Sequence, residues 1–157
     1  MNKYIIGAVV LIIALVIILV SLGSSGNKAT EVAQTTSAIT VPESSYDFGE
    51  IDIFGGKVST EYLLKNEGAE DVLILSAITS CMCTEGKIDD LRFSLHESSG
   101  GVVTIPAGGE KTLIAIYDPL AHGPDSTGKV KRELSLKTNS SVAPEVQVTF
   151  AANVVKN

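Results

Sequence analysis

The chain has 157 residues, with 18 acidic and 12 basic side chains, no tryptophan and two cysteines. This length accommodates one ordinary domain and an appendage. From residue 41 onward there are 17 acidic and 10 basic residues, and the basic residues do not cluster. This charge argues against a nucleic-acid partner, because phosphates would be repelled.

The first 22 residues are predicted to be a membrane anchor. Tyr4 to Leu22 contains nineteen residues without a charge. As an α-helix this segment would be about 28 Å long, which matches the hydrocarbon core of a bilayer. The apolar region of a cleaved signal peptide is usually shorter, about 7–15 residues. Lys3 precedes the span, so we expect a single-pass protein of the cell membrane with its domain on the extracytoplasmic side.

Residues 23–40 are predicted to be a flexible linker. The segment consists mainly of Gly, Ser, Thr, Ala, Asn and Gln, with few aliphatic side chains. Such a composition buries too little apolar surface to offset the entropy cost of ordering. The folded domain is therefore expected to comprise residues 41–157.

The domain is predicted to be all-β. Short runs of β-branched and aromatic residues alternate with turns rich in Gly, Asn and Pro, and no apolar stripe has helical spacing. The expected strands are residues 39–51 with a break at Pro42, 58–66, 71–80, 102–105, 111–118, 129–138 and 145–154. About seven strands at this spacing indicate an immunoglobulin-like sandwich of two sheets. The pattern leaves open whether residues 85–99 form strands or a long loop.

Several short motifs occur in an order that resembles one bacterial family. They are Tyr46-Asp47-Phe48-Gly49, Lys65-Asn66-Glu67-Gly68, Asp71-Val72-Leu73-Ile74, Ser80-Cys81-Met82-Cys83-Thr84, Pro106-Ala107-Gly108-Gly109-Glu110 and Thr138-Asn139. This series resembles the domain of unknown function 1573 family. The resemblance implies a secreted or surface-tethered sandwich, similar in architecture to sperm-protein and cilia-associated modules, which mostly bind other proteins. It implies no established activity.

The chain departs from that family pattern at two places. Met82 occupies a position where the family usually has glycine, and residues 85–101 form a long insert before the Pro-Gly turn. If the glycine has a positive φ, methionine would adopt that conformation only at a cost, so the turn in this chain is expected to differ in shape.

The Cys-Met-Cys turn admits three interpretations. In the first, Cys81 and Cys83 are the primary ligands of copper(I) or zinc, His122 is the third ligand, and Met82 or His96 is auxiliary. In the second, the two cysteines form a local disulfide, which the predicted compartment favours. In the third, they are small buried hydrophobic residues, and both histidines are ordinary loop residues.

These observations favour a membrane-tethered, non-catalytic module that binds a protein partner or a metal ion. No nucleophile motif, glycine-rich phosphate loop or paired acidic motif stands out, so we do not expect an enzyme. The rival hypothesis is a redox or copper-handling factor that acts through Cys81 and Cys83.

Overall fold

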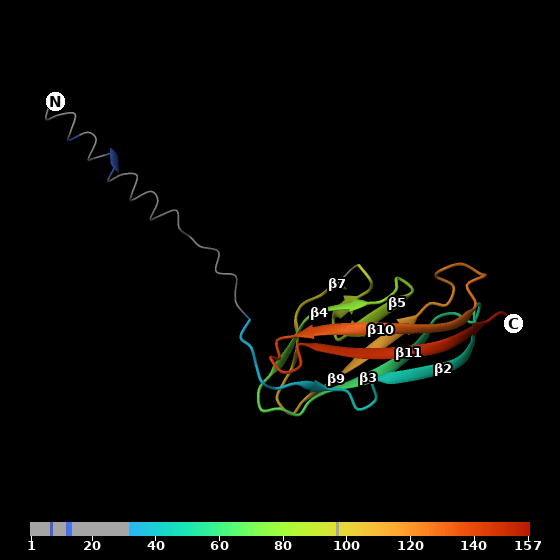
Figure 1. Ribbon diagram of the computed structural model, residues 1–157, viewed down its shortest axis with the longest axis horizontal. Coiled ribbons are helices and arrows are strands. Elements are labelled where there is room, and N and C mark those ends of the chain that lie inside the picture. The colour runs from blue at the N-terminus through green and yellow to red at the C-terminus, as the bar shows by residue number, and fades with distance from the viewer. Residues whose placement is uncertain (1–6, 8–11, 14–31, 97) are drawn as a thin grey trace. The chain divides into compact units, whose positions relative to one another are not determined.

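The computed structural model describes residues 7, 12, 13, 32–96 and 98–157 (Figure 1). The chain divides into two compact units, Met1–Val32 and Ala33–Asn157. The predicted anchor and the first part of the predicted linker lie mostly outside the described residues. Within the described part of the chain, no helix is both long enough and apolar enough to cross a membrane.

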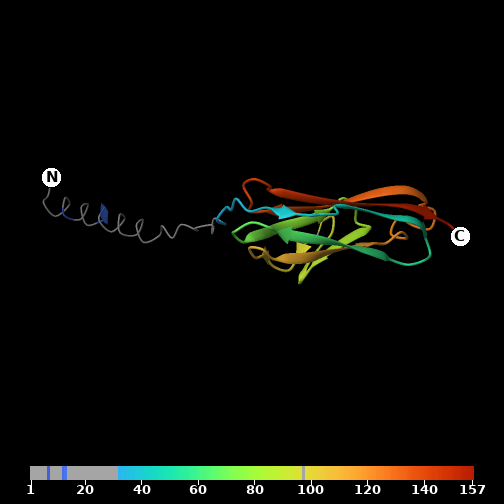
Figure 2. The same ribbon diagram turned by 90° about the horizontal axis from the view of Figure 1, so that it is seen from below.

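The second unit is a sandwich of two sheets. Its strands are β1 (Ile39–Thr40), β2 (Ser45–Asp52), β3 (Val58–Asn66), β4 (Val72–Thr79), β5 (Thr84–Ile88), β6 (Leu91–Phe93), β7 (Ser98–Ser99), β8 (Val103–Ile105), β9 (Glu110–Tyr117), β10 (Gly128–Thr138) and β11 (Glu145–Val155). One sheet has the order β1-β3-β9-β5-β6-β7 and the other β2-β11-β10-β4-β8. Figure 2 shows β10 and β11 in one layer and β3 and β9 in the other.

The predicted all-β sandwich is confirmed, but the expected strand number was too low. The structure has eleven strands in the described residues. The segment before residue 52 forms two strands in different sheets, because β1 pairs with β3 and β2 pairs with β11. The insert after the cysteines supplies three more strands, β5, β6 and β7.

The core lies between the sheets and follows the alternation of the sequence. In β11 every second residue is buried, from Val146 through Val148 and Phe150 to Val154. Because successive side chains of a strand point to opposite faces, this period of two directs one apolar row to the interior. Tyr62 links the layers, since its hydroxyl donates a hydrogen bond of 2.7 Å to the Thr149 carbonyl of the other sheet.

Three short strands form in residues 84–99, where the sequence pattern left strand and loop undecided. Gly86 of β5 pairs with Phe93 of β6, and a Cβ atom at position 86 would collide with the Phe93 ring. The absence of a side chain therefore lets this ring pack across β5 into the core. Asp89 has a φ of 49° in the tight turn between the strands, and its carboxylate accepts a hydrogen bond of 2.7 Å from Lys111.

The structure corrects the boundary between linker and domain. Residues 33–40, predicted as the end of the linker, belong to the sandwich unit. Thr35 and Ser37 are buried, and the Asn139 side chain donates a hydrogen bond of 2.8 Å to the Ala33 carbonyl. Polar groups of the domain thus form hydrogen bonds with this segment, although the segment contains no apolar run. Its composition therefore resembled that of a linker.

Candidate functional site

The cysteines lie on a tight turn between β4 and β5, at one end of the sandwich. Thr79 is buried, and its hydroxyl donates to the carbonyls of Cys81 at 2.9 Å and Thr84 at 3.2 Å. The Thr84 amide also donates to the Cys81 carbonyl at 3.1 Å, which closes a four-residue turn. The turn is therefore held by Thr79 from within and does not depend on the sulfur atoms alone.

Neighbouring segments hold the turn from both sides. The Ser80 amide donates to the Glu133 carbonyl at 2.9 Å, and the Glu133 amide donates to the Ser80 hydroxyl at 2.9 Å. On the other sheet, the Asp118 amide donates to the Cys83 carbonyl at 2.9 Å. Strand β10 and the loop after β9 thus fix the positions of the two cysteines relative to the rest of the domain.

Cys81 and Cys83 form a disulfide in this structure. Their Cα atoms are 5.2 Å apart, which is closer than the roughly 6.5 Å expected for alternate residues of an extended strand. The turn supplies this shorter separation. In the described part of the chain neither cysteine is a free thiol, so the interpretation of both residues as inert buried thiols does not describe this state.

The two sulfur atoms lie in different surroundings. Cys81 is partly exposed, and its Sγ accepts a hydrogen bond of 3.1 Å from the Cys83 amide and lies 3.1 Å from Nε2 of the exposed His122. Cys83 is only 3% exposed, and its Sγ accepts a hydrogen bond of 3.1 Å from Nε of Arg132. Each sulfur thus has a side-chain nitrogen beside it.

The loop after β9 brings His122 to this end of the sandwich. Asp118 accepts a hydrogen bond of 3.0 Å from the Leu120 amide, and the Ser126 hydroxyl donates to the His122 carbonyl at 2.8 Å. Gly123 has a φ of 93°, a conformation that few other residues adopt. The loop is therefore a folded turn of the chain in which His122 has a defined place.

Three of the five predicted ligands converge. The donor atoms of Cys81, Cys83 and His122 all lie within 4.8 Å of one another. Met82 lies between the cysteines and is 70% exposed. His96 is exposed in the turn between β6 and β7 and does not belong to the three-residue group, so the structure does not place it as a ligand.

The sequence of the domain identifies its family. The family described as "Protein of unknown function (DUF1573)" matches residues 39–154. The chain belongs to this family. The Cys81-Met82-Cys83 turn lies within the matched region. No curated protein matches the chain.

The fold of this DUF1573 domain is similar to that of one solved structure with a TM-score above 0.5. A protein of unknown function from Porphyromonas gingivalis W83 is 18% identical, with a TM-score of 0.61, and the match covers 81% of this chain and 51% of that protein. The chain therefore spans about half the length of that relative. An ASH/PapD-like domain of human CEP192 is 14% identical, with a TM-score of 0.49, and the match covers 85% of this chain and 97% of that domain.

One residue beside the cysteines of this DUF1573 domain, Arg132, was not predicted from the sequence. It lies on β10, 49 positions after Cys83, and its guanidinium is 6.0 Å from the centre of the Tyr117 ring. Burial raises the pKa of Tyr117, the charge of Arg132 opposes this rise, and Asp118 adds to it. Nothing in the sequence around Arg132 predicts this contact, because the contact depends on the register of β10.

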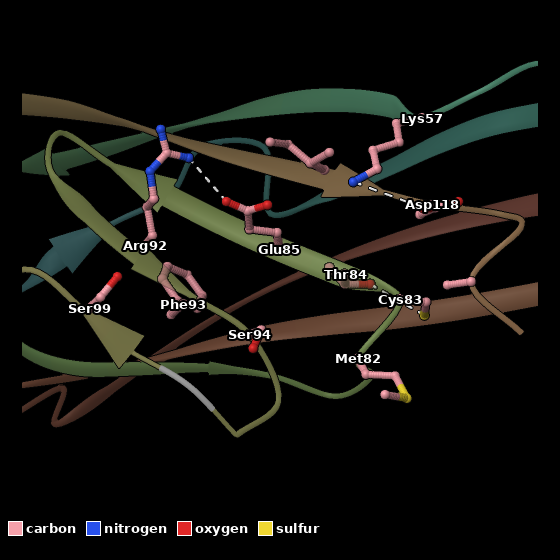
Figure 3. A pocket seen from close by; sticks show the side chains of 12 residues that line it. Lys57, Met82, Cys83, Thr84, Glu85, Arg92, Phe93, Ser94, Ser99 and Asp118 are labelled. Carbon is pink, nitrogen blue, oxygen red and sulfur yellow. Dashed lines mark hydrogen bonds and ion pairs between the residues drawn. The ribbon is translucent and has the colours of Figure 1, made fainter.

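A pocket of about 370 Å³ borders the disulfide on the side of Cys83. Met82 lies at its edge in Figure 3, and two ion pairs cross its lining. Arg92 lies 3.1 Å from Glu85, and Lys57 lies 3.9 Å from Asp118. Its lining combines these charged side chains with apolar groups such as the Phe93 ring.

Proposed function

We propose that the chain is a membrane-tethered, extracytoplasmic and non-catalytic binding module whose Cys81, Cys83 and His122 bind a thiophilic metal ion once the disulfide is reduced. Copper(I) is the preferred ion and zinc the alternative. The observation that carries the proposal is the convergence of two sulfur atoms and one imidazole nitrogen within 4.8 Å.

The separation of the donor atoms fits a single metal ion. Metal–sulfur bonds of about 2.3 Å and metal–nitrogen bonds of about 2.0 Å place neighbouring ligands roughly 3–4 Å apart. Cys81 Sγ already lies 3.1 Å from His122 Nε2. Reduction of the bridge frees the two sulfur atoms to separate, and the Thr79 hydrogen bonds hold the turn meanwhile. The disulfide form has no thiolates, so only the reduced form would bind the ion.

The donor set favours copper(I) over zinc. Thiolate and imidazole are soft or borderline ligands, and thiolate in particular selects copper(I). Zinc in structural sites takes four ligands in a tetrahedron. Among the described residues, the group contains three donors of the Cys, His, Asp and Glu types. The exposed thioether of Met82 is an auxiliary donor that again suits copper(I) better than zinc.

The membrane tether and the extracytoplasmic location are inferred from the sequence, and the disulfide of the site supports the location. Residues 4–22 have the length and composition of a membrane span, and Lys3 precedes them. Disulfides persist mainly outside the cytosol, which agrees with an extracytoplasmic domain. A protease added to intact cells should then digest residues 33–157. Protection in intact cells, with digestion only after lysis, would reverse the orientation.

A metal-binding module on a membrane requires a partner that delivers or accepts the ion. The domain carries an excess of acidic residues, so its partner is expected to be a protein and not a nucleic acid. A basic surface on that protein would approach this acidic domain most readily, because opposite charges accelerate encounter.

The test is a copper(I) titration of the reduced full-length chain against a coloured chelator. We expect one ion per chain, no binding by the oxidised chain and no binding by the Cys81→Ser/Cys83→Ser variant. His122→Gln should weaken binding at least tenfold, because one of three ligands is lost. His96→Gln is the matched control and should bind like the wild type. Equal loss in His122→Gln and His96→Gln, or unchanged affinity in both, would overturn the assignment of His122.

A further inference from the structure

We propose that the Cys81–Cys83 bridge undergoes thiol–disulfide exchange with a fixed polarity, in which an incoming thiolate attacks Cys81 and Cys83 leaves as a thiolate held by Arg132. The activity is distinct from metal binding and does not depend on it. The partner class is a thiol, and for complete reduction of the bridge a dithiol. Three observations support the polarity.

The first observation is the difference in exposure. Cys81 is partly exposed, whereas Cys83 is 3% exposed and belongs to the core cluster. Exchange requires an approach of the attacking sulfur to one disulfide sulfur, so access selects the site of attack. A reagent from solvent therefore meets Cys81 more readily than Cys83.

The second observation is the permanent positive charge beside Cys83. Arg132 Nε donates a hydrogen bond of 3.1 Å to Cys83 Sγ, and a guanidinium stays protonated at every ordinary pH. As the S–S bond breaks, negative charge develops on the leaving sulfur. A hydrogen bond from a cation to that charge is stronger than one between neutral groups, so it favours Cys83 as the leaving group.

The third observation is that Arg132 is positioned by the fold. Its guanidinium packs 6.0 Å from the centre of the Tyr117 ring, and its Nη1 donates to the Lys131 carbonyl at 2.9 Å. These contacts hold the side chain in place before any reaction. The donor therefore requires little reorganisation when the charge appears on Cys83.

The chemical steps balance for a dithiol reagent. Its first thiolate forms a bond to Cys81 Sγ, the Cys81–Cys83 bond breaks, and the electron pair remains on Cys83 as a thiolate. The second thiolate of the reagent then attacks its own first sulfur, and Cys81 leaves as a thiolate. The dithiol is oxidised by two electrons to a disulfide, the bridge is reduced to two thiols, and the two protons of the reagent end on Cys81 and Cys83.

Met82 makes the polarity measurable. Cyanogen bromide cleaves after methionine, and Met82 is the only methionine besides Met1. Cleavage therefore separates the two cysteines into different fragments. The oxidised full-length chain is treated with glutathione in the presence of a metal chelator, and free thiols are then blocked with N-ethylmaleimide. The chain is cleaved with cyanogen bromide in acid, and the masses of the fragments are measured by mass spectrometry.

The expected product carries glutathione on the fragment that ends at Met82 and the maleimide on the fragment that begins at Cys83. The reverse labelling, or equal labelling of both fragments, would overturn the polarity. The pocket on the side of Cys83 provides the route by which that reverse result would arise. The chelator keeps this result independent of metal binding, so failure of one proposal is distinguishable from failure of the other.

A rate measurement tests the role of Arg132 even where the mixed disulfide is too short-lived to isolate. We expect Arg132→Gln to slow reduction of the bridge by dithiothreitol about tenfold, since a hydrogen bond to a charged group is lost. Arg132→Lys keeps the charge and should recover part of the rate. Lys137→Gln is the control, because Lys137 is an exposed basic residue of the same strand, five positions after Arg132. Equal rates for Arg132→Gln and Lys137→Gln, at unchanged unfolding free energy, would overturn the role of Arg132.

Discussion

The two ends of the sandwich use polar residues in opposite ways. At the end where β4 begins, Asn66 and Asn139 are buried, and their side chains form hydrogen bonds with backbone atoms. At the end where β4 finishes, Cys81 is partly exposed and lies beside His122. Strand β4 joins the two ends.

This difference separates the residues that stabilise the fold from the residues that are available to react or to bind a ligand. Asn66 Nδ2 donates to the carbonyls of Glu70, Ile105 and Pro106, at 2.8, 2.9 and 3.1 Å, and its Oδ1 accepts from the Gly68 amide at 3.1 Å. Both amide hydrogens are therefore engaged, and no donor of Asn66 remains for a ligand. At the sulfur end, by contrast, Thr79 and Ser80 hold the turn, so the sulfur atoms are available to react. We therefore expect substitutions at the first end to affect folding and those at the second to affect binding.

The largest effect is expected for Asn66→Ala. This residue is 1% exposed, and its loss removes one buried hydrogen bond, to the Ile105 carbonyl, and three part-buried ones. A buried carbonyl left unpaired costs about 1–3 kcal/mol and each of the other bonds about 0.5–1.5 kcal/mol, so the unfolding free energy should fall by about 3 kcal/mol. Asn153→Ala is the control, because its side chain makes a single exposed hydrogen bond with Glu50. Urea unfolding measures both, and similar losses would remove the distinction between the two ends.

The second-largest effect is expected from Tyr62, a residue of the core between the two sheets. Burial, with a smaller contribution from the charge of Tyr46, raises the pKa of Tyr62 to about 12 from 10.0. The unfolded chain therefore ionises first as pH rises. The contribution of Tyr62 is fully present below pH 10 and is lost between about pH 10 and 12, by up to about 2–3 kcal/mol.

Tyr62→Phe isolates this contribution. The variant loses the hydrogen bond to Thr149, at a cost of about 1 kcal/mol near neutral pH. Its unfolding free energy should then decline less steeply than that of the wild type above pH 10. Parallel alkaline profiles for the two proteins would show that Tyr62 does not set this dependence.

Reduction of the disulfide should have the smallest effect on folding. The bridge closes a loop of only three residues, and chain entropy then contributes about 1.5 kcal/mol. Urea unfolding with and without a reductant should show a loss near this value, smaller than that of Asn66→Ala. Complete unfolding upon reduction would contradict the independence of the turn and the bridge.

The strands from β-branched and apolar runs between clear turns were predictable from sequence to within one residue at each end. Residues 111–118 and 145–154 were predicted, and β9 and β11 occupy Glu110–Tyr117 and Glu145–Val155. Residues 71–80 are apolar on both faces, which favours a strand covered on both sides. Strand β4 does lie between β10 and β8, but Leu75 and Ile78 are exposed on its outer face.

The site was predictable only where its residues are chemically rare. Cys81, Cys83 and His122 were found because cysteine and histidine are scarce in this chain. His96 was included for the same reason and lies outside the group. Arg132 could not be found, because its contact with Cys83 arises from the register of β10, which composition and spacing do not encode.

The central claim is that the sulfur end of the domain binds a thiophilic ion after reduction. X-ray absorption at the copper edge of the reduced, copper(I)-loaded chain tests it most directly. The account predicts two sulfur neighbours and one imidazole nitrogen, with the nitrogen absent in His122→Gln and retained in His96→Gln. A spectrum without sulfur neighbours, or one in which His122→Gln leaves the nitrogen unchanged, would contradict it.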